Sequence, residues 1–102
     1  MDRVTMLKQF LDENPNDAFA RYGLAMEYSK AGEVETALAE YRKIIETNPD
    51  YTPAYQMAGQ MLAEKGRTDE ARKFFEQGIA SAKRGGNAHA QSEMQGLLDE
   101  LG

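Results

Sequence analysis

Few residues in this sequence are of types that could carry out chemistry. The one histidine is His89, and no cysteine is present to act as a nucleophile or a thiolate metal ligand. Acidic residues occur in three neighbouring pairs, Asp12-Glu13, Asp69-Glu70 and Asp99-Glu100. These pairs fall at expected helix ends or on polar faces, so no buried acid–base pair with separated pKa values is predicted. We therefore expect no catalytic residue, no metal site and no enzymatic activity.

Binding of phosphate groups or nucleic acid is not expected either. Gly85-Gly86 is not followed by the Lys-Ser/Thr of a phosphate-binding loop. The chain has 102 residues and a formal net charge of −5, whereas nucleic-acid binding needs a clustered basic surface. Lys83-Arg84 is the nearest approach to such a cluster, and it precedes a predicted helix end, where positive side chains complement the helix dipole. We expect no cofactor and no nucleic-acid partner.

The sequence also carries no sign of membrane insertion. No run approaches the roughly 18 apolar residues that a bilayer-spanning helix needs. Charges at Asp2, Arg3 and Lys8 interrupt the apolar core that a signal peptide would have. The lack of cysteine is compatible with a reducing compartment. We expect a soluble, cytoplasmic protein without a membrane partner.

The elements that would position a binding site repeat with a period of 34 residues. A shift of 34 residues places Pro15 on Pro49 and Gly32 on Gly66. Large apolar residues agree in three copies: Leu7 with Tyr41 and Phe75, and Leu11 with Ile45 and Ile79. Agreement in both helix-breaking and apolar positions indicates a true internal repeat.

Hydrophobic periodicity predicts a helical element in each part of this repeat. One domain is expected over residues 1–102, with a first helix at 2–13, a full helix–turn–helix unit at 18–51, a second unit at 52–85 and a last helix at 87–101. The first helix is expected to bury one apolar face, formed by Val4, Leu7, Phe10 and Leu11.

The ends of these helices are predicted from residue type. The expected N-terminal capping residues are Asp17, Thr52, Thr68 and Asn87. Gly32 and Gly66 are expected to end the first helix of each unit. Extending the 34-residue register places Glu93 where Ala25 and Gly59 stand. The last helix is therefore expected to be a polar-backed cap and not a third copy.

This pattern resembles the tetratricopeptide repeat (TPR) family. A Leu/small step in the first helix is read in Leu24-Ala25 and Ala58-Gly59, followed one turn later by Tyr28 and Leu62. The second helices carry a small residue followed by an aromatic, as Ala37 with Tyr41 and Ala71 with Phe75. The resemblance implies an all-α fold, an α-α superhelix or TPR-like solenoid. Two full helix-turn-helix repeats would be flanked by an N-terminal half-repeat helix and a C-terminal capping helix, as in small stand-alone bacterial TPR proteins.

Two residues depart from the family pattern. Arg21 stands where the family places a large apolar side chain, whereas the second unit keeps Tyr55 there. The first turn of that helix is expected to be looser or to be shielded in another way. Lys83 stands where a closing proline would be, so the last helix need not keep the usual angle to its neighbours.

The resemblance implies that partners dock on a concave face lined by the first helix of each unit. In the first unit Phe19, Tyr22 and Met26 form a second apolar stripe, which is more than one buried face requires. The matching side of the second unit carries amides, which can pair with a peptide backbone. The expected partner-binding residues are therefore Phe19, Tyr22, Met26, Gln56, Gln60 and Glu64.

The stripe leaves several alternatives open. Phe19, Tyr22 and Met26 could pack on the 2–13 helix, form a homodimer contact or bind another protein, and Gln56 and Gln60 could be solvated polar residues. Two functions follow: an adaptor that binds a peptide or amphipathic helix of another protein, and a structural module that self-associates. Tyr22 and Met26 replace the Lys and Asn with which chaperone-docking TPR domains hold a C-terminal carboxylate, so that mode of binding is not expected.

Overall fold

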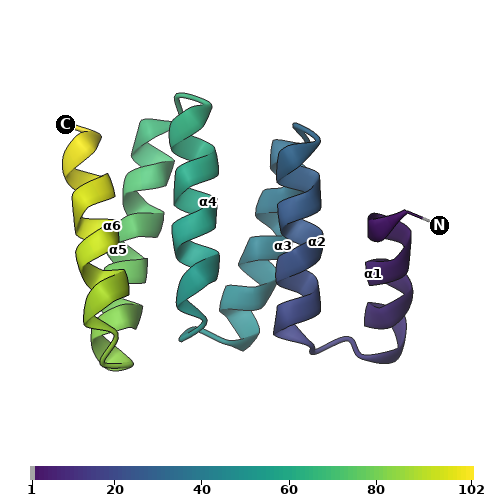
Figure 1. Ribbon diagram of the computed structural model, residues 1–102. Coiled ribbons are helices and arrows are strands. Elements are labelled where there is room, and N and C mark those ends of the chain that lie inside the picture. The colour runs from purple at the N-terminus through teal and green to yellow at the C-terminus, as the bar shows by residue number, and fades with distance from the viewer. Residues whose placement is uncertain (1) are drawn as a thin grey trace. The chain divides into compact units, whose positions relative to one another are not determined.

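The computed structural model describes residues 2–102, which form six α-helices and no strand (Figure 1). The helices are α1 (Arg3–Glu13), α2 (Ala18–Lys30), α3 (Val34–Thr47), α4 (Thr52–Glu64), α5 (Thr68–Arg84) and α6 (Ala88–Glu100). The predicted all-α class is confirmed, with two helix–turn–helix pairs between a first and a last helix.

The helices group into two compact units. The first extends to Asn48 and contains α1 to α3, and the second is Pro49–Gly102 and contains α4 to α6. The division follows the 34-residue punctuation at Pro49, two residues before the end predicted for the first repeat. The expectation of one domain over residues 1–102 stays a prediction.

In the first unit α2 packs against both α1 and α3. Leu11 of α1 is buried against Ala20 and Leu24 of α2, with Val4, Leu7 and Tyr28 around them. The prediction that Phe10 shares this buried face is wrong, because its side chain is 46% exposed. Phe10 lies about 100° around the helix from Leu11, so it falls outside the face that contacts α2.

In the second unit α5 packs against α4 and α6. Two glycines allow this close approach. A Cβ atom on Gly59 would lie 2.5 Å from the Phe75 ring, and one on Gly78 would lie 2.5 Å from the Met94 sulfur. Phe75 and Met94 are almost fully buried. Their side chains occupy the volume that residues larger than glycine would need.

Two of the four predicted N-caps are confirmed and two are wrong. Asp17 and Asn87 each accept a hydrogen bond from the backbone N–H three residues later, at 2.9 and 3.0 Å. Thr52 and Thr68 are instead the first residues of α4 and α5, and neither helix has a side-chain capping bond. The Thr52 hydroxyl contacts Ser81 Oγ at 2.9 Å, so a tertiary contact takes the place of the cap.

The predicted glycine turns are confirmed. Gly32 and Gly66 have φ values of 80° and 76°, in the left-handed region that ends helices.

The register predicted for the last helix is wrong by two residues. The residues preceding α2 and α4, Asp17 and Tyr51, are 34 residues apart, but Asn87 follows Tyr51 by 36. The longer interval reflects α5, which has 17 residues where α3 has 14. With the helix starts aligned, Met94 occupies the position of Leu24 and Ala58, and like them it is buried. The Glu93 alignment was therefore misplaced.

Candidate functional site

The apolar stripe of α2 is partly covered and partly exposed. Phe19 is 77% exposed, whereas Tyr22 and Met26 are half-buried. The Tyr22 ring makes an edge contact with Tyr41 of α3, with ring centroids 6.2 Å apart and planes at 63°. Burial raises the pKa of the Tyr41 phenol, which is enclosed beside this contact. The predicted binding residues of the first unit thus form a row whose most exposed member is Phe19.

The predicted binding residues of the second unit lie along α4. Gln56 and Gln60 are half-buried and Glu64 is exposed at the last residue of the helix. The three residues are four apart, so they lie on one side of α4. Each amide offers donors and an acceptor, and the carboxylate adds a negative charge at the end of the row. The row is polar throughout, in contrast to the stripe of α2.

A charged cluster that the sequence reasoning did not identify lies between α2 and α3. Arg21 Nη1 donates to Glu40 Oε1 at 2.6 Å, and Arg21 Nη2 donates to the Pro15 carbonyl at 3.0 Å. Lys43 Nζ lies 3.7 Å from the other Glu40 oxygen. Arg21 is therefore shielded by a partly buried ion pair, which is one of the two outcomes expected for this departure from the repeat pattern.

The cluster borders a hollow of about 490 Å³ in the first unit. Its polar lining includes Lys8, Asp12, Arg21 and Glu40, with Tyr28 beside them. The Lys8 ammonium lies 5.8 Å from the centre of the Tyr28 ring, and the contact with Tyr28 raises the pKa of Lys8. The sequence signal for this site is that Arg21 and Glu40 both occupy positions where the second unit has aromatic residues.

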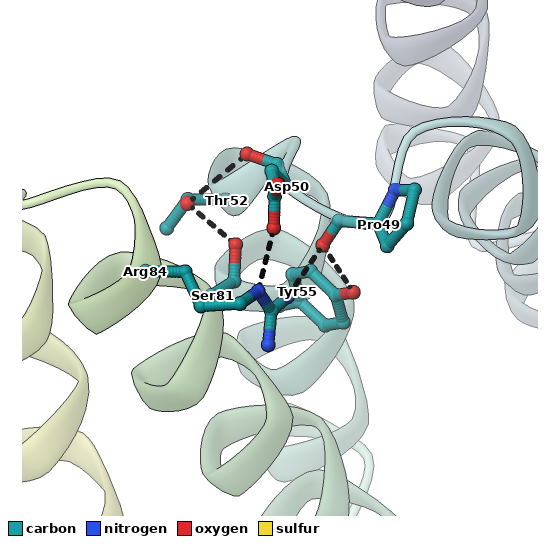
Figure 2. A network of polar contacts seen from close by, with 6 residues as sticks. All are labelled: Pro49, Asp50, Thr52, Tyr55, Ser81 and Arg84. Carbon is teal, nitrogen blue, oxygen red and sulfur yellow. Dashed lines mark hydrogen bonds and ion pairs between the residues drawn. The ribbon is translucent and has the colours of Figure 1, made fainter.

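A second polar network closes the start of α4 onto the end of α5 (Figure 2). Arg84 Nε pairs with Asp50 Oδ1 at 2.7 Å, and Arg84 Nη2 donates to the Pro49 carbonyl at 3.2 Å. The Tyr55 hydroxyl donates to the same carbonyl at 2.6 Å. The hydrogen bond to Asp50 raises the pKa of Arg84, and burial raises the pKa of Tyr55. All these groups bond to one another, so the network serves to position α4 and α5.

The residues that could have suggested catalysis are dispersed. His89 is exposed, and its Nε2 lies 3.1 Å from Glu93 Oε1 one turn later in α6. Residues 2–102 contain no group of three or more His, Cys, Asp or Glu side chains placed to hold a metal ion. Within the same range, no helix combines the length and apolar content of a membrane span.

Known proteins resemble this chain in both sequence and structure. A family model described as tetratricopeptide repeat matches residues 4–62 and 28–101. A TPR repeat-containing protein of Pseudomonas aeruginosa is 30% identical over 95 residues, which are 93% of this chain and 90% of that protein.

Solved structures agree with these matches. The solution structure of a tetratricopeptide repeat domain protein from Salinibacter ruber is 36% identical, covers 85% of this chain and 88% of its own, and has a TM-score of 0.79. The solution structure of a Bordetella parapertussis protein is 25% identical, covers 99% of this chain and 88% of its own, and has a TM-score of 0.84.

Proposed function

Because this chain belongs to the tetratricopeptide repeat family, whose repeats generally mediate protein–protein interaction, we propose that it is a non-catalytic module that binds a peptide or amphipathic helix of another protein. The contacts that we propose are made by α2 through Phe19, Tyr22 and Met26, and by α4 through Gln56, Gln60 and Glu64. The most exposed of these apolar residues, Phe19, carries the proposal.

The chemistry of the α2 stripe supports an apolar anchor in the partner. Phe19 is a large aromatic side chain that is 77% exposed, in a row with the half-buried Tyr22 and Met26. Aromatic and methionine side chains are enriched where proteins bind partners, and methionine adapts to irregular surfaces. The Tyr41 contact holds the Tyr22 ring in place, so binding would cost less side-chain entropy. An apolar side chain of a helix or peptide would bury Phe19 and Met26.

The chemistry of α4 supports contacts of a different kind. The amides of Gln56 and Gln60 can donate to and accept from an extended peptide backbone. Glu64 adds a carboxylate that would favour a basic residue in the partner. With its net charge of −5, the chain as a whole would also attract basic peptides more than acidic ones.

The absence of catalysis is part of the proposal. His89 is exposed and paired with Glu93, so it is not held beside a nucleophile. The best-formed charge cluster, Arg21 with Glu40, is an ion pair whose two members satisfy each other. Such a pair stabilises helix packing and offers no free group for acid–base transfer.

A peptide-display selection against the purified chain tests this proposal. Selected peptides should carry an apolar anchor, and the fluorescence anisotropy of a labelled peptide should give its affinity. Phe19→Glu should weaken binding by at least tenfold because it places a charge in an apolar contact. Gln60→Ala should weaken binding severalfold. Ala39→Glu, the same kind of change at an exposed position of α3, is the matched control and should have no effect.

Equal affinity for wild-type and Phe19→Glu protein would overturn the α2 contact, and failure to select any peptide would overturn the adaptor function. Self-association through Phe19, Tyr22 and Met26 is the alternative, since the same exposed aromatic could meet its copy. It predicts a wild-type mass above that of a monomer in light scattering and a monomeric Phe19→Glu variant.

A further inference from the structure

Helix α1 has an exposed face that is distinct from the stripe of α2. Arg3, Met6, Phe10 and Glu13 are spaced three, four and three residues apart, so they form one row along the helix. We call these four residues the α1 outer row. Met6 and Phe10 are 56% and 46% exposed and, with Phe19, are the large apolar side chains exposed on the described chain. Val4, Leu7 and Leu11, on the other side of the helix, pack towards α2.

The repeat register shows what the α1 outer row corresponds to. Met6 and Phe10 align with Glu40 and Ile44 of α3 and, one period later, with Phe74 and Gly78 of α5. In α3 and α5 these positions face the first helix of the same repeat: Glu40 pairs with Arg21, and a Cβ on Gly78 would lie 2.8 Å from Tyr55 Cβ. Both Ile44 and Phe74 are buried. The outer row of α1 is thus a helix-packing surface left uncovered within residues 2–102.

The charges of the α1 outer row indicate what can cover it. Read from Arg3 to Glu13, the row is positive, apolar, apolar and negative, so the reversed row is its own complement. Two antiparallel α1 helices would place Arg3 opposite Glu13 twice and Met6 opposite Phe10 twice. A parallel pair would instead place like charges together. We propose that two copies of this chain associate through their α1 outer rows, antiparallel and related by a two-fold axis.

The surroundings of the row are compatible with this pairing. Lys8 lies on another side of α1, over the Tyr28 ring, so the two Lys8 side chains do not meet in the seam. Arg3 Nε is 3.5 Å from Glu27, but the Arg3 side chain is 65% exposed and its other N–H groups can reach a second carboxylate. Met6 against Phe10 is a sulfur–aromatic contact, which is favourable in packed interfaces.

The two ends of the chain differ in this respect. Helix α6 carries exposed Glu93 and Glu100 and the small Gly96, which has open space around it. This polar exterior is what a terminal helix of a repeat protein needs to remain in water. The α1 outer row instead presents two large apolar side chains, so α1 rather than α6 is the self-associating helix.

The interface is small, so the association should be weak. Each α1 helix has 11 residues, and a pair of such helices falls at or below the lower limit of about 1,200 Å² for standard stable interfaces. We expect a dissociation constant on the order of 10 to 100 μM. Sedimentation velocity of the full chain from 5 μM to 1 mM should therefore show a mass that rises from monomer to dimer and no further.

Charge reversal tests the antiparallel arrangement. Glu13→Arg alone and Arg3→Glu alone should each weaken association at least tenfold, because each places like charges opposite one another. An equimolar mixture of the two variants should restore dimers, since one variant is then negative and the other positive at both ends of the row. The double variant Arg3→Glu/Glu13→Arg should also dimerise. Phe10→Glu should abolish association.

Three controls separate this proposal from its alternatives. Glu27→Gln removes the intramolecular partner of Arg3 without altering the row, and it should leave association unchanged. Phe19→Glu should also leave it unchanged. Circular dichroism should show native helix content for every variant. A wild type that is monomeric at 1 mM, a mixture that stays monomeric, or loss of dimers in Phe19→Glu with dimers retained in Phe10→Glu would each overturn the proposal.

Discussion

The first and second units bind the same backbone carbonyl with different side chains. In the first unit Arg21 Nη2 donates to the carbonyl of Pro15, and in the second the Tyr55 hydroxyl donates to the carbonyl of Pro49. Both bonds join residues six apart, and both fix the chain that enters the first helix of a repeat. A position that departs from the repeat pattern in residue type therefore keeps the same hydrogen bond.

The residues opposite this position differ in step with it. Arg21 faces Glu40, whereas the equivalent of Glu40 in the second unit is Phe74, buried in the same unit as the buried Tyr55. The first unit fills this place with an ion pair and the second with aromatic surface. An ion pair shielded from water depends on both partners, because a single remaining charge would be desolvated without compensation. The aromatic arrangement carries no such condition.

The close contacts of the two units differ as well. Ala25 and Ile44 in the first unit correspond to Gly59 and Gly78 in the second. The second unit uses the space of the missing side chains for the Phe75 ring and the Met94 side chain. The first unit instead has the edge contact of Tyr22 with Tyr41. One repeat pattern thus accommodates two ways of filling its interior.

The largest expected effect comes from transplanting the aromatic arrangement into the first unit. Arg21→Tyr alone leaves Glu40 shielded with only Lys43 nearby, and it should lower the free energy of unfolding by about 2–3 kcal/mol. Glu40→Phe alone leaves the Arg21 charge unpaired and should also destabilise. The double variant should lie within about 1 kcal/mol of wild type or above it, since apolar replacements of partly buried ion pairs are often neutral or stabilising.

Urea unfolding of the four proteins, followed by circular dichroism, gives the coupling between the two positions. Additive losses in the double variant would show that Arg21 and Tyr55 are not interchangeable solutions. A double variant that is stable but loses the Pro15 contact would be recognised by faster amide exchange near Asp17.

The second effect concerns the glycines of the second unit. Gly59→Ala gains about 1 kcal/mol of helix propensity, but its Cβ would lie 2.5 Å from the Phe75 ring. Overpacking of this kind costs about 1–3 kcal/mol, so net destabilisation of up to about 2 kcal/mol is expected.

Gly96→Ala is the matched control, because α6 has open space at that position. It should raise the free energy of unfolding by about 0.5–1 kcal/mol, and thermal unfolding would show the opposite signs of the two changes. If Gly59→Ala stabilised as much as Gly96→Ala, the Phe75 ring would have room to shift.

The helices could be predicted from the sequence because their signals are local and repeated. Gly32 and Gly66 combine a helix end with a left-handed backbone, and the 34-residue period fixes which apolar residues correspond. The threonine caps failed for a tertiary reason, since Thr52 bonds to Ser81, which lies 29 residues further along the chain. The register of α6 failed because the extra turn of α5 carries no periodic signal.

The candidate site was predictable only in part. The second stripe of α2 indicated that Phe19 would remain exposed, but the cover of Tyr22 depends on Tyr41, which belongs to the next helix. Arg21 was recognisable as a departure from the repeat, whereas its compensation required comparing a second position, Glu40 with Phe74, between the repeats. Single positions thus reveal exceptions, and pairs of positions reveal how they are accommodated.

The smallest expected effect separates the buried phenols of the two units. Burial raises the pKa of Tyr41 above its ordinary value of 10.0, with a further contribution from Tyr22, and burial also raises the pKa of Tyr55. A raised pKa in the folded state means that the stabilising contribution is complete below pH 10 and declines as pH rises through the folded value. The urea midpoint should therefore fall between pH 10 and pH 11.5.

Phenylalanine substitutions should distinguish the two units in this range. Tyr41→Phe should remove more of the alkaline decline than Tyr55→Phe, because Arg84 favours the ionised form of Tyr55 and partly opposes the effect of burial. At pH 7 the order should reverse, since Tyr55→Phe loses the hydrogen bond to the Pro49 carbonyl, worth about 1 kcal/mol. Equal alkaline declines in wild type and Tyr41→Phe would show that the Tyr41 phenol opens to solvent before the first unit unfolds, which would place its weakest point at the Tyr22–Tyr41 contact.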